Sequence, residues 1–407
     1  MGRGLRLSPG KEALTVLDFV GQAHQKYSFE ERFKVLLGRT RKTVVQEIKA
    51  GFINVPKGCS IQLEKQAEKY ILENIKSAIN NKRNILIKLQ DHLERNNELN
   101  AFDFYKNYHV KPQDVYGKRY TLTGLAVENN LIKGYSLDKD KERLMALALG
   151  RLSFANSRRW LEFLLRILPV IKESQGSYSI KLEKKEKTML TMFYYTLWGK
   201  GLEELSIKFS CLEEAIAWAI DDKLLYQELL ALLNYQFEKI YFLDKPLLSL
   251  DQETPLDLYC AYTLDQILVA LGKYSEERSS SFREGVLYLP EKNLDVFFVT
   301  LNKSEKDYSP STMYKDYSIN EELFHWQSQS RTTIESPTGQ RYINQKPNKT
   351  NVLLFVREYK KEAGLTAPYT CLGLVDYVNH YGSAPINIVW KVREKMPGFV
   401  LQKTAKV

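Results

Sequence analysis

The spacing of apolar residues changes once along this chain, from a helical rhythm to runs typical of strands. Between about residues 60 and 240, apolar side chains recur every three or four positions, as at Leu225, Leu229 and Leu232, which places them on one face of a helix. Beyond residue 250 the apolar residues form short runs bounded by Pro, Gly and Ser. These runs lie at 295–301, 352–356 and 386–392. The pattern predicts a mainly helical middle region followed by a β-rich region.

The three runs differ in how they distribute polar residues. Those at 295–301 and 352–356 are apolar at successive positions, whereas the run at 386–392 alternates between apolar and polar residues. A strand buried on both faces gives the first pattern, and a strand with one wet face gives the second. We therefore expect a barrel-like domain from residue 251 to residue 407, which is an ordinary domain size.

The N-terminal residues suggest a different type of structure. An apolar segment at 14–20 is followed by a helix-like segment at 27–38, where Ser28 is a suitable N-cap and Gly38 a suitable stop. A strand followed by a helix is typical of an α/β lobe. We predict an α+β multidomain protein in three parts. These are the end of an α/β lobe at 1–55, the helical middle region at 56–250 and the β-rich domain at 251–407.

The charge of the chain favours an anionic partner. Its 59 Lys and Arg residues outnumber its 49 Asp and Glu residues, which gives a net charge of +10. Such a balance permits binding to nucleic acid through phosphate contacts and counterion release. The 25 tyrosines outnumber the 18 phenylalanines, and tyrosine suits half-wet surfaces where rings meet a partner. Composition alone therefore allows a nucleic-acid-binding protein.

The four cysteines are scattered, with neither a Cys-x-x-Cys pair nor a histidine at ligand spacing. This distribution predicts reduced, packed thiols, no metal site and a cytoplasmic protein. The first apolar segment is short and contains Asp18, and the longest later run, at 161–171, is interrupted by charges. Neither has the length of a signal peptide or a membrane span, so we expect no membrane partner.

A strand predicted at 324–330 carries the candidate site. Because neighbouring side chains on a strand point to opposite faces, His325, Gln327 and Gln329 share one face and Trp326 lies on the other. Amide and imidazole groups can read base edges, cations hold phosphates, and aromatic rings stack on unpaired bases. The alternative is that Trp326 fills the core and the glutamines fasten loops. The candidate nucleic-acid-binding residues are Tyr314, Lys315, Tyr317, His325, Trp326, Gln327, Gln329, Arg341 and Arg357.

Other polar patterns support different hypotheses. Glu358 and Lys360 have the E-x-K spacing by which a carboxylate binds a metal and a lysine steadies the attacking water. A nuclease of this type needs a further carboxylate, for which Asp295 and Asp316 are candidates. The basic segment 151–159, followed by Trp160, is more typical of a solvated helix face above a buried ring than of a phosphate contact.

The first residues resemble the last motif of superfamily-two helicases, which reads Q-x-x-G-R-x-x-R. Gly2, Arg3 and Arg6 match its Gly and its two Arg, and an apolar segment follows. The resemblance implies that residues 1–55 end a RecA-like lobe and that Arg3 and Arg6 are arginine fingers in a longer protein that uses ATP and Mg²⁺. The phosphate loop and the magnesium-binding carboxylate that such catalysis needs are missing here. We expect this chain alone not to hydrolyse ATP.

A second resemblance covers the C-terminal region in order. It rests on the segments at 283–286, 298–304, 309–317, 324–330, 354–358 and 367–373. They resemble a bacterial domain of unknown function that follows a superfamily-two helicase core, often with a phospholipase-D-like nuclease at the far N-terminus. The resemblance implies a restriction or phage-defence setting without an agreed activity for the domain.

Three hypotheses remain after these patterns are combined. The first is a non-catalytic, DNA-engaging portion of a defence-type helicase whose C-terminal domain recognises nucleic acid. The second is a docking module for a nuclease domain or another partner subunit. The third is a metal-dependent nuclease that uses Glu358 and Lys360.

Overall fold

The protein forms two compact units, residues 1–80 and 81–407. The computed structural model describes residues 81–176, 181–247, 250, 253–282, 284–302 and 316–404. It also describes positions 16, 29, 33, 37, 44–52, 55, 59–64, 67, 68, 71, 72 and 75 of the first unit. Within this part of the chain, no helix is long and apolar enough to cross a membrane.

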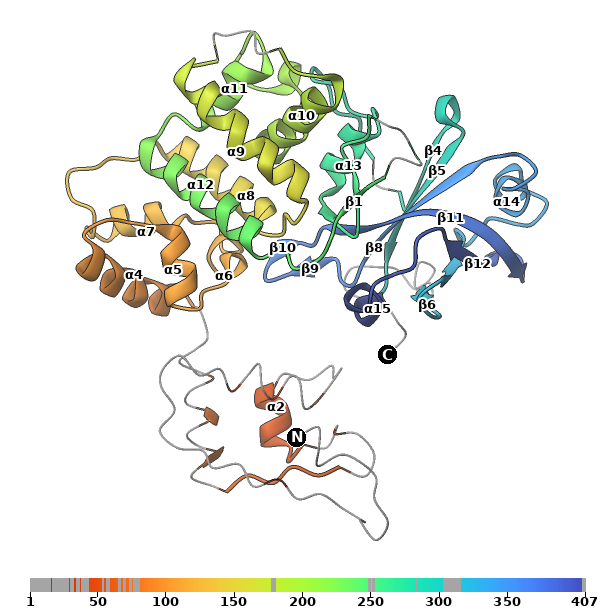
Figure 1. Ribbon diagram of the computed structural model, residues 1–407, viewed down its shortest axis with the longest axis horizontal. Coiled ribbons are helices and arrows are strands. Elements are labelled where there is room, and N and C mark those ends of the chain that lie inside the picture. The colour runs from red at the N-terminus through yellow and green to blue at the C-terminus, as the bar shows by residue number, and fades with distance from the viewer. Residues whose placement is uncertain are drawn as a thin grey trace. The chain divides into compact units, whose positions relative to one another are not determined.

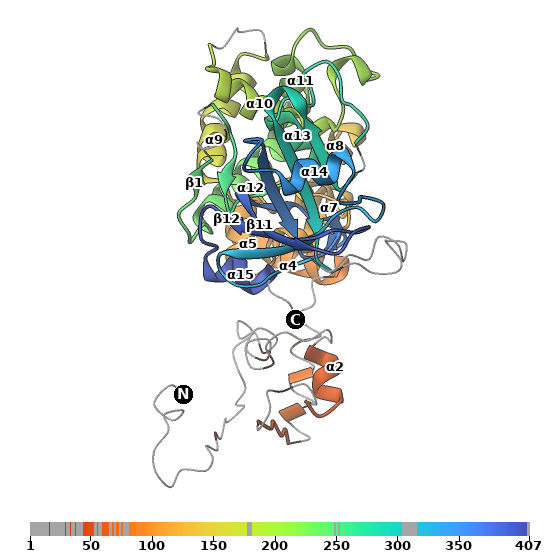
Figure 2. The same cartoon turned by 90° about the vertical axis from the view of Figure 1, so that its right-hand side faces the viewer.

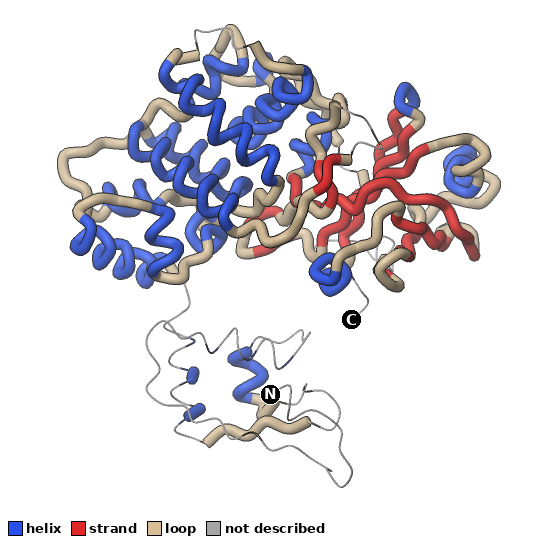
Figure 3. Tube along the Cα trace, in the orientation of Figure 1, coloured by secondary structure: helices blue, strands red, loops and turns tan. Residues whose placement is uncertain are grey.

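Helices fill the middle of the sequence, as the apolar rhythm predicts (Figure 3). They begin at suitable caps: Asn81, for example, accepts from the backbone N–H of Asn84 at 2.9 Å. The helices that the structure describes are α2 (Val44–Lys49), α4 (Lys82–Asn96), α5 (Ala101–Asn107), α6 (Pro112–Tyr116), α7 (Leu122–Glu128), α8 (Lys139–Leu152), α9 (Arg158–Glu173), α10 (Lys184–Trp198), α11 (Leu212–Ala219), α12 (Lys223–Glu238), α13 (Leu264–Ala270), α14 (Pro337–Ile343) and α15 (Gly398–Thr404), with the short 3₁₀ turns η1 (Leu202–Glu204) and η2 (Pro290–Lys292).

Strands follow α12 (Figure 1). The strands that the structure describes are β1 (Lys245–Pro246), β2 (Asp257–Leu258), β3 (Ala261–Tyr262), β4 (Val286–Leu289), β5 (Leu294–Thr300), β6 (Tyr317–Ser318), β7 (Leu323–Gln327), β8 (Asn351–Arg357), β9 (Lys361–Glu362), β10 (Leu365–Thr366), β11 (Tyr369–Tyr381) and β12 (Asn387–Val392). The three runs predicted from sequence are confirmed as β5, β8 and β12. The mixed α+β class is confirmed as well.

One eight-stranded sheet dominates the C-terminal region. Figure 2 views the second unit from the side on which these strands lie. The order of the sheet is β4-β5-β8-β11-β12-β7-β6, with β3 paired to β11 beside this path. Strands β5 and β8 are parallel, and the other neighbours are antiparallel. The long β11 pairs with β8 along its first half and with β12 along its second half. A bulge lies at Gly373, where φ is +83° and a Cβ would approach Leu258 to 2.4 Å, so the position requires glycine.

The expectation of a barrel is wrong. In the described sheet, β4 pairs only with β5 and β6 only with β7, so its two ends do not meet. Strand β5 is nevertheless buried along its whole length. Phe297 on one face contacts Tyr342 of α14, with ring centroids 5.4 Å apart, and Phe298 on the other contacts Phe282 at 5.5 Å. Cover on both faces of an open sheet produces the same apolar run as closure into a barrel does.

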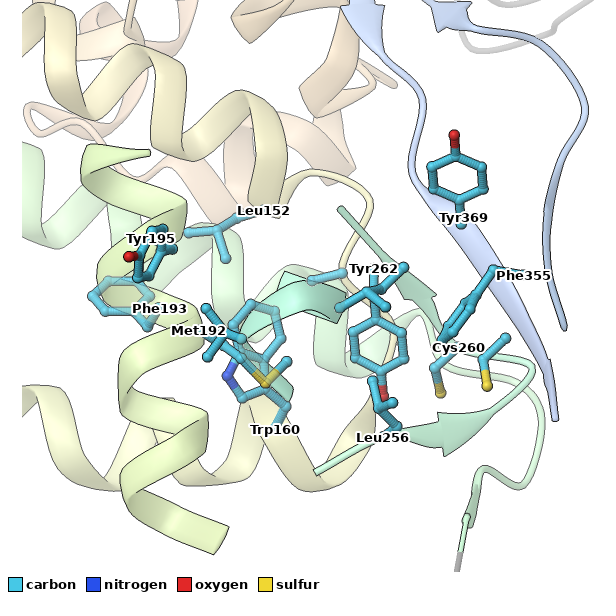
Figure 4. Close-up of a cluster of buried hydrophobic side chains, with 14 of the residues drawn as sticks. Leu152, Trp160, Met192, Phe193, Tyr195, Leu256, Cys260, Tyr262, Phe355 and Tyr369 are labelled. Atoms are coloured by element: carbon cyan, nitrogen blue, oxygen red, sulfur yellow. The ribbon is translucent and has the colours of Figure 1, made fainter. Parts of the chain in front are cut away.

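The helices and the sheet of the second unit share one hydrophobic core. Figure 4 shows Trp160 of α9 and Met192 of α10 on the helical side, with Tyr262 of β3 and Phe355 of β8 beyond them. The indole N–H of Trp160 donates to the Met189 carbonyl at 3.1 Å, so this ring is in the core as the sequence predicted. The helical and β-rich regions are therefore packed together.

Polar contacts also join the two regions. Arg159, the second residue of α9, pairs with Asp257 of β2 at 2.8 Å, and Asp257 is 1% exposed. The hydroxyl of Ser157 donates to the same carboxylate at 2.6 Å. Burial raises the pKa of the Asp257 carboxyl, although Arg159 opposes this shift. The sequence predicted that segment 151–159 forms a solvated helix face. Arg159 instead makes a contact between the helical and β-rich regions.

The first unit is described at separate positions. Phe29, Phe33 and Leu37 are helical and buried, and they belong to a small core with Val44 and Ile48 of α2. Helical conformation at these three positions agrees with the helix-like segment predicted at 27–38. Arg3, Arg6 and the strand expected at 14–20, except Val16, lie outside the described residues. The α/β lobe and its RecA-like character therefore stay predictions.

Candidate nucleic-acid interface

The outer face of β6, β7 and the end of β11 brings together two predicted residues and one unpredicted residue. Tyr317 of β6 pairs with His325 of β7, and their rings stack with centroids 5.0 Å apart. The Nε2 atom of His325 lies 3.1 Å from the hydroxyl of Tyr381. His325 is 4% exposed, whereas Tyr381 is 59% exposed. A buried imidazole therefore helps to hold an exposed tyrosine ring in place.

Two amide side chains lie on the same face. Gln327 donates through Nε2 to Oδ1 of Asn387 at 2.7 Å, and its backbone N–H donates to Asp316 at 2.9 Å. The Nδ2 of Asn387 donates to the Tyr381 carbonyl at 3.4 Å. We name this group, Tyr317, His325, Gln327, Tyr381 and Asn387, the Tyr381 face. An exposed ring beside held amides can stack on an unpaired base and hydrogen-bond to its edge.

Trp326 lies on the opposite side of β7, as the alternation predicted. Its ring stacks on Phe297 of β5 with centroids 4.0 Å apart and an interplanar angle of 11°. Tyr342 meets it edge-on at 5.4 Å, and Trp326 is 4% exposed. This environment is that of a core residue, the alternative interpretation of the sequence. The ring offers no open face to a base in this conformation, so we leave it out of the interface.

Arg341 and Gln329 also make internal contacts. The guanidinium of Arg341 donates two hydrogen bonds, of 2.7 and 2.9 Å, to the fully buried carboxylate of Asp295. It also lies 3.8 Å from the ring centroid of Tyr288. Burial raises the pKa of the Asp295 carboxyl, and the pairing with Arg341 works against that rise. The Oε1 of Gln329 accepts from the hydroxyl of Thr332 at 3.3 Å. Arg341 therefore serves first to neutralise a buried charge.

Arg357 is held at the end of β8, apart from the Tyr381 face in the sheet order. Its Nε donates to the hydroxyl of Thr300 at 2.9 Å, and Nη1 donates to the Ala367 carbonyl at 3.2 Å. The guanidinium lies 4.3 Å from the ring centroid of Tyr369. Tyr314 and Lys315 lie outside the described residues. Of the predicted set, the structure thus gathers Tyr317, His325 and Gln327.

The nuclease hypothesis gains no support from the described residues. The carboxylate of Asp295 is ion-paired with Arg341, and that of Asp316 accepts a hydrogen bond from the backbone N–H of Gln327. In this part of the chain, Glu358 is not within any group of three side chains at metal-ligand spacing.

One group in the described ranges does have that spacing, at the junction of helices and sheet. The ligand atoms of Asp244, Asp257 and Cys260 lie within 4.8 Å of one another. Arg159 is ion-paired with Asp257, and the Arg158 backbone N–H donates to Asp244 at 2.7 Å. These donors already satisfy the carboxylates, so we regard the group as structural.

Sequence reasoning missed Tyr381 and Asn387. Both lie near the turn between β11 and β12, and the register pairs them directly. The strand at 386–392 was predicted, but its partner strand was not. Which strands pair, and in which register, is set by the fold of the whole domain and not by the local sequence. A Tyr-Gly-Ser segment before a predicted strand was the available signal.

These observations define an α+β domain with its candidate site on an antiparallel part of an open sheet. Residues 256–398 match the family described as a domain of unknown function, DUF3427. The matched range includes all five residues of the Tyr381 face. It fits the helicase-associated C-terminal domain that the sequence resembles. No curated protein matches the chain.

Proposed function

We propose that this chain is the DNA-engaging portion of a defence-type helicase, and that its C-terminal domain recognises nucleic acid through the Tyr381 face. The observation that carries the proposal is the exposed ring of Tyr381, held by buried His325 beside the Gln327–Asn387 amide pair. The net charge of +10 supports it, because cations supply the phosphate contacts that bases do not. The DUF3427 match at residues 256–398 is consistent with it.

In this proposal the chain does not itself catalyse a reaction. Arg3 and Arg6 would stabilise the transferred phosphoryl group only in a longer protein, where another lobe binds ATP and Mg²⁺. The setting would be the cytoplasm, with a nuclease domain or subunit as a further partner. The C-terminal domain would contribute recognition of DNA to that machine.

Binding of a labelled oligothymidylate, measured by fluorescence anisotropy between about 50 and 200 mM salt, tests the proposal. We expect log K to fall linearly with log[salt], with a slope of about −0.7 for each phosphate contacted. The Tyr381→Ala variant should bind about five- to 150-fold more weakly, the cost of losing one stacked base. Tyr381→Phe should keep most of the affinity, since it retains the ring.

Tyr359, a 49% exposed tyrosine after β8, provides the matched control. Its replacement by Ala should leave the affinity unchanged. Equal effects of Tyr381→Ala and Tyr359→Ala, or binding with no salt dependence, would refute the proposal.

A second candidate function, docking of a partner protein, is favoured by a groove in the helical region. A cavity of about 730 Å³ is lined by apolar side chains of α4, α12 and the loops beside them. Its polar lining residues are Asn97, Glu98, Asn100, Gln227, Lys133 and Lys223. Among the described residues, neither lysine has an ion-pair partner. An amphipathic helix with apolar residues at i, i+3, i+4 and i+7 and acidic flanks would complement this groove.

A further inference from the structure

A cavity of about 500 Å³ lies where the chain passes from α12 into the β-rich region. Its size is that of a site for a small molecule or one nucleotide. Nine residues line it, from the segment between α12 and β1, the start of β1, the turn after β2, the segment that follows β12 and the start of α15. They are Phe242, Leu243, Lys245, Tyr259, Arg393, Glu394, Lys395, Pro397 and Phe399.

Aromatic rings form one wall of this cavity. Phe242 and Phe399 pack with centroids 5.0 Å apart, and Tyr241 meets Phe399 edge-on at 5.6 Å. Tyr241 is 76% exposed and the neighbouring Leu243 is 84% exposed. Large apolar side chains gathered at a surface mark an interaction site. The wall is mainly aromatic rather than aliphatic, which suits a planar ligand ring better than the Leu and Ile side chains of a helix.

The cavity is held open by a fixed turn. Tyr259 has a positive φ of 66° after β2, and its hydroxyl donates to the Lys395 carbonyl at 2.7 Å. This bond ties the turn to the segment that carries Arg393 and Lys395. The aromatic wall and the cations are therefore brought together by the fold.

Three cations line the cavity, and each has a carboxylate partner that is between about one-third and one-half exposed; Lys395 has a second partner, Glu321, at 3.2 Å. Lys245 lies 3.4 Å from Glu394, Arg393 lies 2.9 Å from Asp376, and Lys395 lies 2.8 Å from Glu322. Because exposed ion pairs are weak and screened by salt, these cations can exchange carboxylate for phosphate. Glu394, itself on the cavity wall, would then turn to solvent.

We propose that this cavity binds one nucleotide of a single strand, with its base stacked on Phe242 and Phe399 and its phosphate held by Lys245 and Lys395. The inference rests on the proposed function and adds the class of substrate, a strand with unstacked bases. Stacking against rings with cations on the adjoining wall is the arrangement by which proteins hold single strands without reading their sequence.

An oligothymidylate carrying 2-aminopurine tests this assignment in the full chain, because stacking quenches the fluorescence of that base. Phe242→Leu and Phe399→Leu, which remove the two stacking rings, should each lower affinity about five- to 150-fold and restore the fluorescence. Lys245→Ser should reduce the salt slope by about 0.7. Both variants keep an apolar side chain, Phe242→Leu in the segment before β1 and Phe399→Leu in α15, so the chain should still fold.

The outcomes separate this site from the Tyr381 face. Absence of any affinity in the wild type overturns both proposals. Affinity that falls in Tyr381→Ala but not in Phe242→Leu or Phe399→Leu overturns the cavity alone. Competition by thymidine monophosphate at the same concentration as the oligonucleotide also overturns it, because a strand makes further phosphate contacts that a mononucleotide lacks.

Discussion

Arg159→Ala is the substitution that most severely tests the packing of helices against the sheet. Its Nη2 lies 2.8 Å from the carboxylate of Asp257 and donates to the carbonyls of Thr254 and Leu256 at 3.1 and 3.2 Å. Truncation leaves Asp257 almost fully buried with Ser157 as a remaining donor. Removing one partner of such a pair costs about 3–5 kcal/mol, because the remaining charge stays buried without an opposite charge beside it.

The cost should depend on pH in a defined direction. Burial already raises the pKa of the Asp257 carboxyl above its unfolded value of about 3.9. A raised folded pKa means that this group's contribution to the unfolding free energy is largest at low pH and is lost as pH rises through the folded pKa. Loss of Arg159 strengthens that effect. The variant's deficit should be largest at neutral pH and shrink as the pH falls toward about 4.

Urea unfolding followed by tryptophan fluorescence measures this deficit, because all five tryptophans lie within residues 81–407. One transition is expected, since Trp160 of α9 and Trp326 of β7 belong to one core. Arg95→Ala, which breaks the exposed pair with Asp91, is the control and should cost less than about 1 kcal/mol. A deficit that small for Arg159→Ala, or separate transitions for helices and sheet, would refute the reasoning.

Two further predictions concern the helical region. The buried carboxylate of Glu228 accepts from Tyr116 and from the backbone N–H groups of Leu122 and Thr123 at 2.7 to 2.9 Å, yet burial raises its pKa. The wild type should therefore lose part of its unfolding free energy relative to Glu228→Gln as pH rises above about 4.3. A difference that instead grows in favour of the wild type would mean that the hydrogen-bond donors to the Glu228 carboxylate outweigh its burial. Peptides selected by display against the chain should carry the amphipathic pattern with acidic flanks that suits the groove, and they should not bind the Leu224→Glu variant. Peptides that still bind this variant would contradict docking in the groove.

The local pattern of the sequence predicted elements well and their partners less well. Alternation placed His325 and Gln327 opposite Trp326, and the apolar runs located β5, β8 and β12, because side-chain direction and burial are properties of the strand itself. The prediction of a closed sheet was wrong. An open sheet that is covered on both faces, as β5 is, produces the same apolar run in the sequence as closure into a barrel does.

The roles of charged residues depend on distant partners. Arg341 meets Asp295 across 46 positions of sequence, and Arg159 meets Asp257 only because α9 packs beside β2. Nothing in the local sequence distinguishes either arginine from a solvated cation. The exposure of Tyr381 has the same origin, since it depends on where β11 extends beyond β8.

The central claim, that the C-terminal domain engages nucleic acid through exposed aromatic rings, is tested most directly by photo-crosslinking. An oligonucleotide carrying 5-iodouracil reacts with aromatic side chains that stack on the substituted base, and peptide mass spectrometry then locates the adduct. The account predicts adducts at Tyr381 and a second set at Phe242 or Phe399 in the cavity. Adducts confined to residues 82–238, or none at saturating oligonucleotide, would contradict it.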